Sequence, residues 1–63
     1  MPIIQIHMLE GRSSEVKKKL LKEMNEVICN TLEVNPHQVK ILLNELPKEH
    51  WSTGGITKDE EKI

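Results

Sequence analysis

The sequence contains one cysteine, one aromatic residue and no long apolar run. The lone Cys29 excludes a disulfide within the chain, and Trp51 is the only aromatic ring available to a core. No apolar stretch approaches the length of a membrane span. The first residues lack the basic flank and long apolar core of a signal peptide. A free thiol without an export signal predicts a cytoplasmic protein.

Neither sign of charge is in excess, because nine basic side chains are balanced by ten acidic ones, for a net charge of −1. This balance gives no field suited to nucleic acid or to an anionic membrane. The histidines do not have metal-ligand spacing with one another or with the cysteine, so no metal site is expected. No Gly-rich loop is placed to hold a phosphate.

The 63 residues are predicted to form a single domain, residues 1–63, in which residues 58–63 are a mobile charged tail. A chain this short buries a small fraction of its surface and is marginally stable alone. Small folds compensate with disulfides, metals or partner subunits. Because the first two are not expected, the sequence predicts self-association.

Residues 3–9 are predicted to be a strand, since β-branched isoleucines favour extended backbone. Alternation gives an apolar face and a mixed face. The apolar face carries Ile4, Ile6 and Met8, and the mixed face carries Ile3, Gln5, His7 and Leu9. A second strand is predicted over residues 39–46, with Lys40, Leu42, Asn44 and Leu46 on its mixed face.

Between the strands, residues 14–32 are predicted to be a helix, with Ser13 or Ser14 as its N-cap. Its apolar positions recur at spacings of three and four, at Val16, Leu20, Met24, Val27, Ile28 and Thr31. Cys29 is expected on the lysine-rich side. After the helix, Asn35 and Pro36 are expected to cap and start a short helical turn.

The predicted fold class is α/β: a single βαβ unit with parallel strands and a right-handed crossover, plus a short C-terminal hairpin. Ile56 and Thr57 are expected to form the edge of this hairpin against a neighbouring subunit. Two strands and one helix leave both sheet edges open and one face uncovered. Open edges invite pairing with another chain, and parallel sheets are normally covered on both faces. Subunits are therefore expected to pair edge to edge and to stack their second faces.

Pro2 has two interpretations. A proline is permitted at the start of a strand without any chemical role. If the initiator Met1 is removed, however, the chain begins with a secondary amine, a group whose reference pKa is about 7.7–8.0. Apolar surroundings and nearby cations would lower the pKa of such an amine. A base with a pKa near neutrality is efficient in proton transfer.

Three other residues also have two interpretations. Arg12 is either a solvated loop residue or a bidentate clamp on a carboxylate. Lys40 either covers apolar surface with its stem at an edge or interface, or supplies a cation to a site. Trp51 either plugs a small core or interface, or walls a pocket and keeps water from an amine.

Several segments together resemble the 4-oxalocrotonate tautomerase family, namely Pro2, Gln5-Ile6-His7, Leu9-Glu10-Gly11-Arg12-Ser13, Glu45, His50 and Gly54-Gly55. The resemblance implies a hexamer of βαβ subunits, built as a trimer of dimers, with active sites shared between subunits. It implies that the amino-terminal proline is a general base that moves a proton between carbons of an unsaturated keto acid through a dienol.

Carried over by position, the resemblance implies that Pro2 is the acid–base group and that Arg12 binds the distal carboxylate of the substrate. Trp51 keeps an aromatic wall, and the backbone of Leu9 faces the pocket. Lys40 departs from the pattern, because the best-known tautomerase has an arginine there that binds the 2-keto or 2-hydroxy group. The predicted catalytic residues are Pro2, Arg12 and Lys40, and the predicted substrate-binding residues are Leu9, Arg12, Lys40 and Trp51.

The leading hypothesis is a homohexameric tautomerase of a 2-hydroxymuconate-like acid, acting in aromatic degradation without a cofactor or metal. One alternative is a non-catalytic oligomeric binding or scaffold protein that keeps the fold, which the lysine at position 40 or a retained Met1 would favour. Another is weak adventitious attack on carbonyls by an amino-terminal proline.

Overall fold

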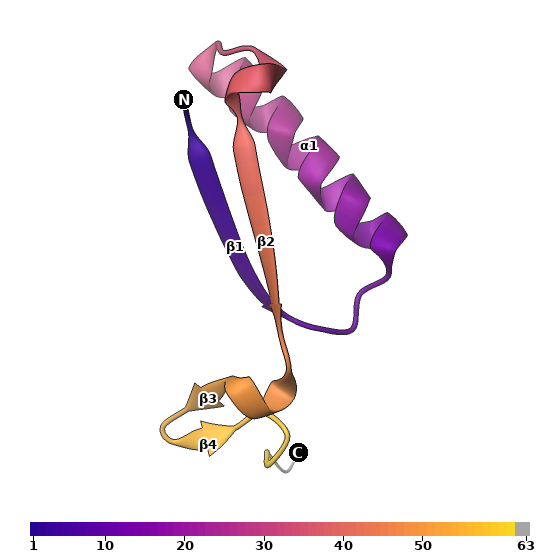
Figure 1. Cartoon of the computed structure of the whole chain (residues 1–63), viewed down its shortest axis with the longest axis vertical. Coiled ribbons are helices and arrows are strands. Elements are labelled where there is room, and N and C mark those ends of the chain that lie inside the picture. Colours follow the sequence, from indigo (N-terminus) through magenta and orange to yellow (C-terminus); the bar gives the residue numbers. More distant parts are fainter. Residues whose placement is uncertain (62–63) are drawn as a thin grey trace.

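Two parallel strands and one long helix make up most of the computed structural model, which describes residues 1–61 (Figure 1). In chain order the elements are β1 (Ile3–Leu9), α1 (Ser14–Leu32), the 3₁₀ helix η1 (Pro36–Gln38), β2 (Lys40–Leu46), the 3₁₀ helix η2 (Lys48–His50), β3 (Ser52–Thr53) and β4 (Ile56–Thr57). This order confirms the predicted α/β class and its βαβ unit with a C-terminal hairpin.

β1 and β2 pair in parallel, and the register places Ile3 beside Lys40 and Leu9 beside Leu46. α1 connects them and covers one face of the pair (Figure 1). The half-buried strand positions alternate as predicted, at Ile4, Ile6, Met8, Ile41 and Leu43. The other face has no cover within the subunit, and Ile3 and Leu42 on it are 63% and 52% exposed.

The bounds of α1 agree with the predicted helix. Ser13 is its N-cap, and the Ser13 hydroxyl accepts a hydrogen bond of 3.2 Å from the amide of Val16. Glu15 lies in the first turn, where a carboxylate is favourable to the helix dipole. The helix ends at Glu33, whose φ of 56° is left-handed and whose amide donates back to the carbonyl of Cys29.

The side of α1 that faces the sheet agrees with the predicted stripe in part, since Leu20, Met24 and Ile28 are half-buried as expected. Val16 and Val27 were expected to face inward, but they are 53% and 64% exposed. Cys29, which was expected on the lysine-rich side, is half-buried, and so is Lys17. The helix is thus rotated about its axis relative to the predicted apolar arc. Lys17 lies on the packed side, where its ammonium reaches the carboxylate of Glu45 on β2.

The turn between α1 and β2 follows the predicted chemistry, with a shift of one residue. Asn35 precedes Pro36, and the Gln38 side-chain oxygen accepts a 3.0 Å hydrogen bond from the amide of Asn35. The amide of Val39 donates to the carbonyl of Pro36 at 3.2 Å. Because this bond closes η1, β2 begins at Lys40 instead of at the expected Val39.

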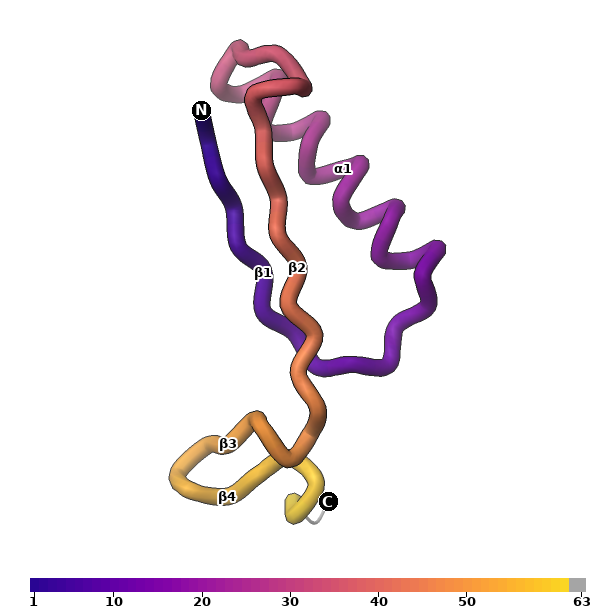
Figure 2. The backbone as a smooth tube through the Cα atoms, in the orientation of Figure 1, coloured from indigo at the N-terminus to yellow at the C-terminus, as the bar shows by residue number. Residues whose placement is uncertain are grey.

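The C-terminal segment forms an arm that projects away from α1 and from the β1–β2 pair (Figures 1 and 2). β3 and β4 pair antiparallel around Gly54 and Gly55, both with positive φ, so the predicted hairpin pairs within its own chain. The amide of Lys58 lies within hydrogen-bonding distance of two carbonyls, those of Lys48 and Trp51. Mobility of the 58–63 tail stays a prediction, and its residues 62–63 lie outside the described part of the chain.

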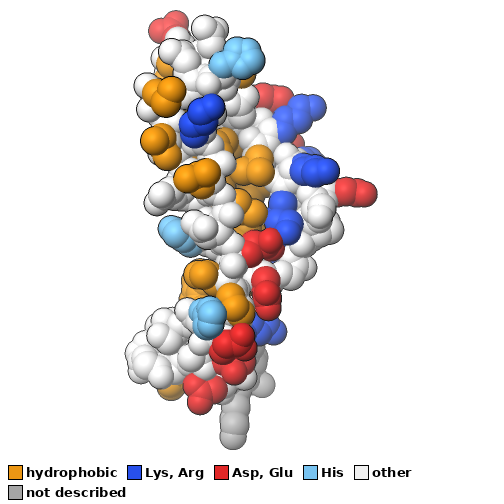
Figure 3. All heavy atoms as spheres, in the orientation of Figure 1, with side chains coloured by type: hydrophobic (Ala, Val, Ile, Leu, Met, Phe, Trp, Pro, Cys, Tyr) orange, Lys and Arg blue, Asp and Glu red, His pale blue; other side chains and the backbone are white. Residues whose placement is uncertain are grey.

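The subunit is neither compact nor self-sufficient. Its radius of gyration is 15.0 Å, whereas a compact domain of this length has about 11 Å. Its accessible surface is 5261 Å², against about 4,200 Å² for a folded monomer of this mass. Within residues 1–61 no side chain is fully buried. Figure 3 shows apolar side chains along the strand side and charged groups on the helix side.

Candidate active site

Pro2 and Lys40 lie together at the amino end of the parallel pair. The amide of Lys40 donates a 3.1 Å hydrogen bond to the carbonyl of Pro2, which extends the ladder one step beyond β1. Pro2 is half-buried, and Lys40 is exposed on the uncovered face. The backbone thus holds a proline next to a lysine at one end of the sheet.

Leu9 and Arg12 lie at the opposite end, where β1 stops. The amide of Glu10 donates to the carbonyl of Leu46 at 3.0 Å, which fixes the start of the connecting loop. Gly11 has a φ of +126°, a conformation that would be strained for a residue with a side chain. Arg12 follows it and directly precedes Ser13, the N-cap of α1. Arg12 is exposed and Leu9 is half-buried.

Trp51 is carried by the arm, directly after η2. Its amide donates to the carbonyl of Lys48 at 3.3 Å, and its carbonyl accepts a 2.8 Å hydrogen bond from the amide of Lys58. These two bonds hold the backbone at Trp51 from both sides. The indole is half-buried. Its place in the chain, five residues after the end of β2, puts it nearest to the carboxyl end of the sheet.

The five predicted site residues therefore fall into two groups in one subunit. Pro2 and Lys40 form the first, and Leu9, Arg12 and Trp51 belong to the other end. The seven residues of β1 separate the ends by about 23 Å at the usual rise of a strand. No cavity is found in residues 1–61 that would join the groups. A pocket containing all five requires more than one subunit.

The two predicted cationic groups are available to an anion. The ion pairs within the described residues are Lys17–Glu45 and Lys58–Glu61, so neither Arg12 nor Lys40 has a carboxylate partner there. A guanidinium binds a carboxylate through two parallel N–H bonds, whereas an ammonium acts as a compact point charge. The chemistry that these groups suit is the binding and polarisation of an acidic substrate.

Within residues 1–61 no three His, Cys, Asp or Glu side chains come together as metal ligands would. In the same range no helix combines the length and the apolar character needed to cross a bilayer.

One feature near the site had no sequence signal. Lys17 Nζ and Glu45 Oε1 lie 2.6 Å apart and connect the first turns of α1 to the end of β2. Lys17 belongs to a run of three lysines, and nothing in that run distinguishes it from Lys18 or Lys19. Glu45 was noted only as part of the family pattern. Only the packing of the helix on the sheet shows which lysine reaches the carboxylate.

The fold and the site define a class of protein: a small parallel βαβ subunit with an uncovered sheet face and a site that one subunit does not complete. Comparisons with known proteins identify its family. A family model described as "Tautomerase enzyme" matches residues 2–60. The chain belongs to the 4-oxalocrotonate tautomerase family, a family of isomerases. The resemblance seen in the sequence is thereby confirmed.

The relatives cover nearly the whole chain. The 2-hydroxymuconate tautomerase of Stutzerimonas stutzeri is 46% identical over 55 residues, 87% of each chain. A solved 4-oxalocrotonate tautomerase isozyme from Methylibium petroleiphilum is 46% identical with a TM-score of 0.87, over 92% of this chain and 91% of its own. A solved heterohexameric 4-oxalocrotonate tautomerase from Chloroflexus aurantiacus is 34% identical with a TM-score of 0.89, over 98% and 100%. These likenesses support a tautomerase activity and do not favour the scaffold alternative.

Proposed function

We propose that the enzyme interconverts the enol and keto forms of an unsaturated 2-oxo acid similar to 2-hydroxymuconate. The observation that carries the proposal is the 46% identity with a 2-hydroxymuconate tautomerase over 87% of both chains. The unpaired cations Arg12 and Lys40 support it, because a conjugated dicarboxylate presents an anionic group at each end.

In this proposal Pro2 carries the proton. Met1 is 81% exposed, so little packing holds it, and its removal turns the Pro2 nitrogen into a secondary amine. The neutral amine takes the proton of the 2-hydroxyl group as the carbonyl forms. The resulting ammonium then gives a proton to the carbon at the far end of the conjugated system. The reaction is a balanced transfer of one proton within the substrate, and no cofactor is proposed.

The other proposed site residues stabilise negative charge on the substrate or keep water away from the amine. Lys40, one ladder step from Pro2, stabilises the negative charge that develops on the 2-oxygen, the kind of interaction that dominates such steps. Arg12 holds the distal carboxylate. Trp51 is the apolar wall that limits water near the amine, and the backbone of Leu9 lines the pocket. Each role is carried over from the family pattern.

The distribution of these residues supports an assembly. Because Pro2 and Leu9 are about 23 Å apart along one strand, we propose that one subunit supplies the amine and another supplies the loop and arm. A homohexamer built as a trimer of dimers meets that requirement. The uncovered face with Ile3 and Leu42 would be its interior. The relative from Chloroflexus aurantiacus is a heterohexamer.

The test combines the mass of the intact protein with a spectroscopic assay of 2-hydroxymuconate and phenylenolpyruvate. The expected mass lacks one methionine residue, and the unsubstituted protein shows saturable turnover. Pro2→Ala is expected to lower kcat/KM by about 100-fold or more, the usual contribution of a positioned general base. Pro36→Ala is the matched control, since Pro36 is the first residue of η1 and is not a proposed site residue.

Two results would contradict the proposal. One is turnover by a protein that retains Met1, because an acylated Pro2 nitrogen cannot accept a proton. The other is a Pro2→Ala variant whose kcat/KM stays close to that of the Pro36→Ala control. Absence of saturation with either acid would instead indicate adventitious chemistry at the amino terminus.

A further inference from the structure

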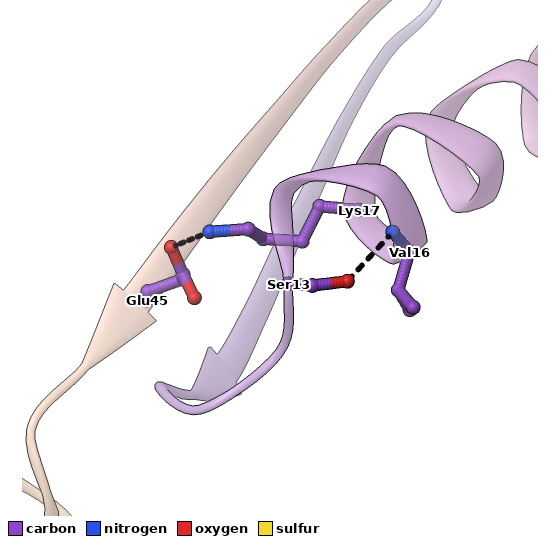
Figure 4. Close-up of polar contacts among 4 residues, drawn as sticks. All are labelled: Ser13, Val16, Lys17 and Glu45. Carbon is purple, nitrogen blue, oxygen red and sulfur yellow. Dashed lines mark hydrogen bonds and ion pairs between the residues drawn. The ribbon is translucent and has the colours of Figure 1, made fainter.

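One ion pair connects the helix layer to the sheet layer. Lys17 Nζ lies 2.6 Å from Glu45 Oε1, and the two side chains are 23% and 29% exposed (Figure 4). This is the only hydrogen bond between side chains of α1 and β2 in the described residues. Because the pair is partly buried, water and salt screen its attraction less than that of a fully exposed pair.

The position of this ion pair relates it to the loop at residues 10–13. At the start of that loop, the amide of Glu10 is hydrogen-bonded to the carbonyl of Leu46. At its end, the Ser13 hydroxyl caps α1 by accepting a hydrogen bond from the amide of Val16 (Figure 4). The Ser13 carbonyl accepts a 3.1 Å hydrogen bond from the amide of Lys17. Ser13, the N-cap of α1, is thus hydrogen-bonded to Lys17, the residue that reaches Glu45.

The loop therefore has two attachments, and both are made to the last two residues of β2. Glu45 holds the helix end of the loop through Lys17, and Leu46 holds the strand end through Glu10. Arg12 lies between the attachments. The arm that carries Trp51 leaves β2 directly after Leu46. The end of β2 is thus attached both to the loop that carries Arg12 and to the arm that carries Trp51.

We infer that Lys17 and Glu45 are positioning residues that fix the Arg12 loop, and through it the binding of a remote carboxylate of the substrate. The inference rests on the proposed role of Arg12. Neither residue needs to touch the substrate. Loss of the ion pair frees the first turn of α1 from β2, so that Arg12 samples more positions and meets the carboxylate less often.

The kinetic test compares Glu45→Gln, Lys17→Met and the double variant on two acids. For 2-hydroxymuconate, which has a distal carboxylate, each single variant is expected to raise KM about two- to fivefold, the range of a partly exposed ion pair. For phenylenolpyruvate, which lacks that carboxylate, KM is expected to stay unchanged, as is kcat for both acids. The double variant is expected to raise KM no further than either single variant, since the two residues act as one unit.

Glu61→Gln is the matched control, because it removes the other ion pair, Lys58–Glu61 at 2.9 Å, which is not attached to the Arg12 loop. It should leave both KM values unchanged. Exchanging the charges in Lys17→Glu/Glu45→Lys should restore KM. If Lys17 itself bound the substrate, Glu45→Gln would release the ammonium and lower KM, which would overturn the inference. Equal changes for both acids, or no change, would also overturn it.

A measurement independent of turnover separates this inference from the proposed function. Amide hydrogen exchange in residues 10–17 is expected to accelerate in Glu45→Gln and not in Glu61→Gln. If the unsubstituted protein turned over neither acid, the proposed function would fail, and the exchange rates would still show whether the ion pair fixes the loop. If exchange were unchanged, the positioning role would be wrong whatever the activity.

Discussion

Among single residues, Lys40 distinguishes this chain most from the family pattern it otherwise follows. An arginine is implied at that position by the family resemblance, and its planar fork would bind two oxygens at once. The ammonium of Lys40 keeps the positive charge and gives up that geometry, and its backbone amide is bonded to the carbonyl of Pro2. Stabilisation of a developing charge on one oxygen needs the charge more than the fork, so the proposed catalytic role is retained.

Two alanine variants separate the proposed roles of the cations. Arg12→Ala is expected to raise KM about 10- to 100-fold with little change in kcat, because it removes charge-assisted hydrogen bonds to a remote group. Lys40→Ala is expected to lower kcat about 100-fold, because it removes a charge that acts on the transition state. Steady-state assays on 2-hydroxymuconate measure both, with Lys22→Ala on the outer side of α1 as control. If Lys40→Ala changed only KM, its proposed role would be wrong.

The residues proposed for the site were all chosen from the sequence, in part from their chemistry and in part from the family resemblance, which alone pointed to Leu9. Pro2 can become an amine, and Trp51 is the only aromatic residue. The Lys17–Glu45 ion pair could not be chosen this way. A lysine in a lysine run and a glutamate on a strand have no pattern in common until the helix lies on the sheet.

Among the elements, α1 shows where sequence periodicity is reliable and where it is not. Its bounds were predicted, since a serine cap before the helix and the Asn35-Pro36 pair after it are local signals. Its packed side was predicted only in part: Leu20, Met24 and Ile28 pack as expected, whereas Val16 and Val27, which have the same spacing, are exposed. Which of two adjacent apolar arcs faces a sheet depends on the partner layer and not on the helix alone.

The cap of α1 gives a test at this scale. Ser13→Ala removes the acceptor for the Val16 amide and is expected to destabilise the protein by about 1 kcal/mol per subunit. Ser14→Ala is the matched control, because Ser14 is the first residue of α1 and alanine has a higher helix propensity. Urea denaturation at one fixed protein concentration measures both, since the stability of an oligomer depends on concentration. Equal effects of the two substitutions would refute the capping role.

At the scale of the whole molecule, the described part of a single subunit has no buried core and leaves one face of its sheet uncovered. Its radius of gyration is 15.0 Å and none of its residues 1–61 is fully buried, which reflects an arm and a sheet face without cover. Self-association was predicted from the short length of the chain and from the open edges and uncovered face of the predicted sheet. The arrangement of the partners could not follow from the same reasoning, because one sheet edge can pair in several registers with another chain.

Subunit mixing tests whether the proposed site is shared. Pro2→Ala and Arg12→Ala subunits are unfolded together and refolded, and activity is measured at a substrate concentration well below KM. If each site takes its amine and its guanidinium from different subunits, random assembly gives about one quarter of the sites both native residues. If both came from one subunit, the refolded mixture would be no more active than the two variants refolded separately.

A reciprocal mixture makes the result quantitative. Wild-type subunits refolded with an equal amount of the Pro2→Ala/Arg12→Ala double variant should also give about one quarter of native activity if sites are shared, but about one half if they are not. The two mixtures contain the same number of intact residues and differ only in how these are divided among chains. Since β1 keeps Pro2 and Arg12 at opposite ends of the sheet, the structure favours equal activities in the two mixtures. An inactive first mixture and a half-active second one would show that each subunit builds its own site.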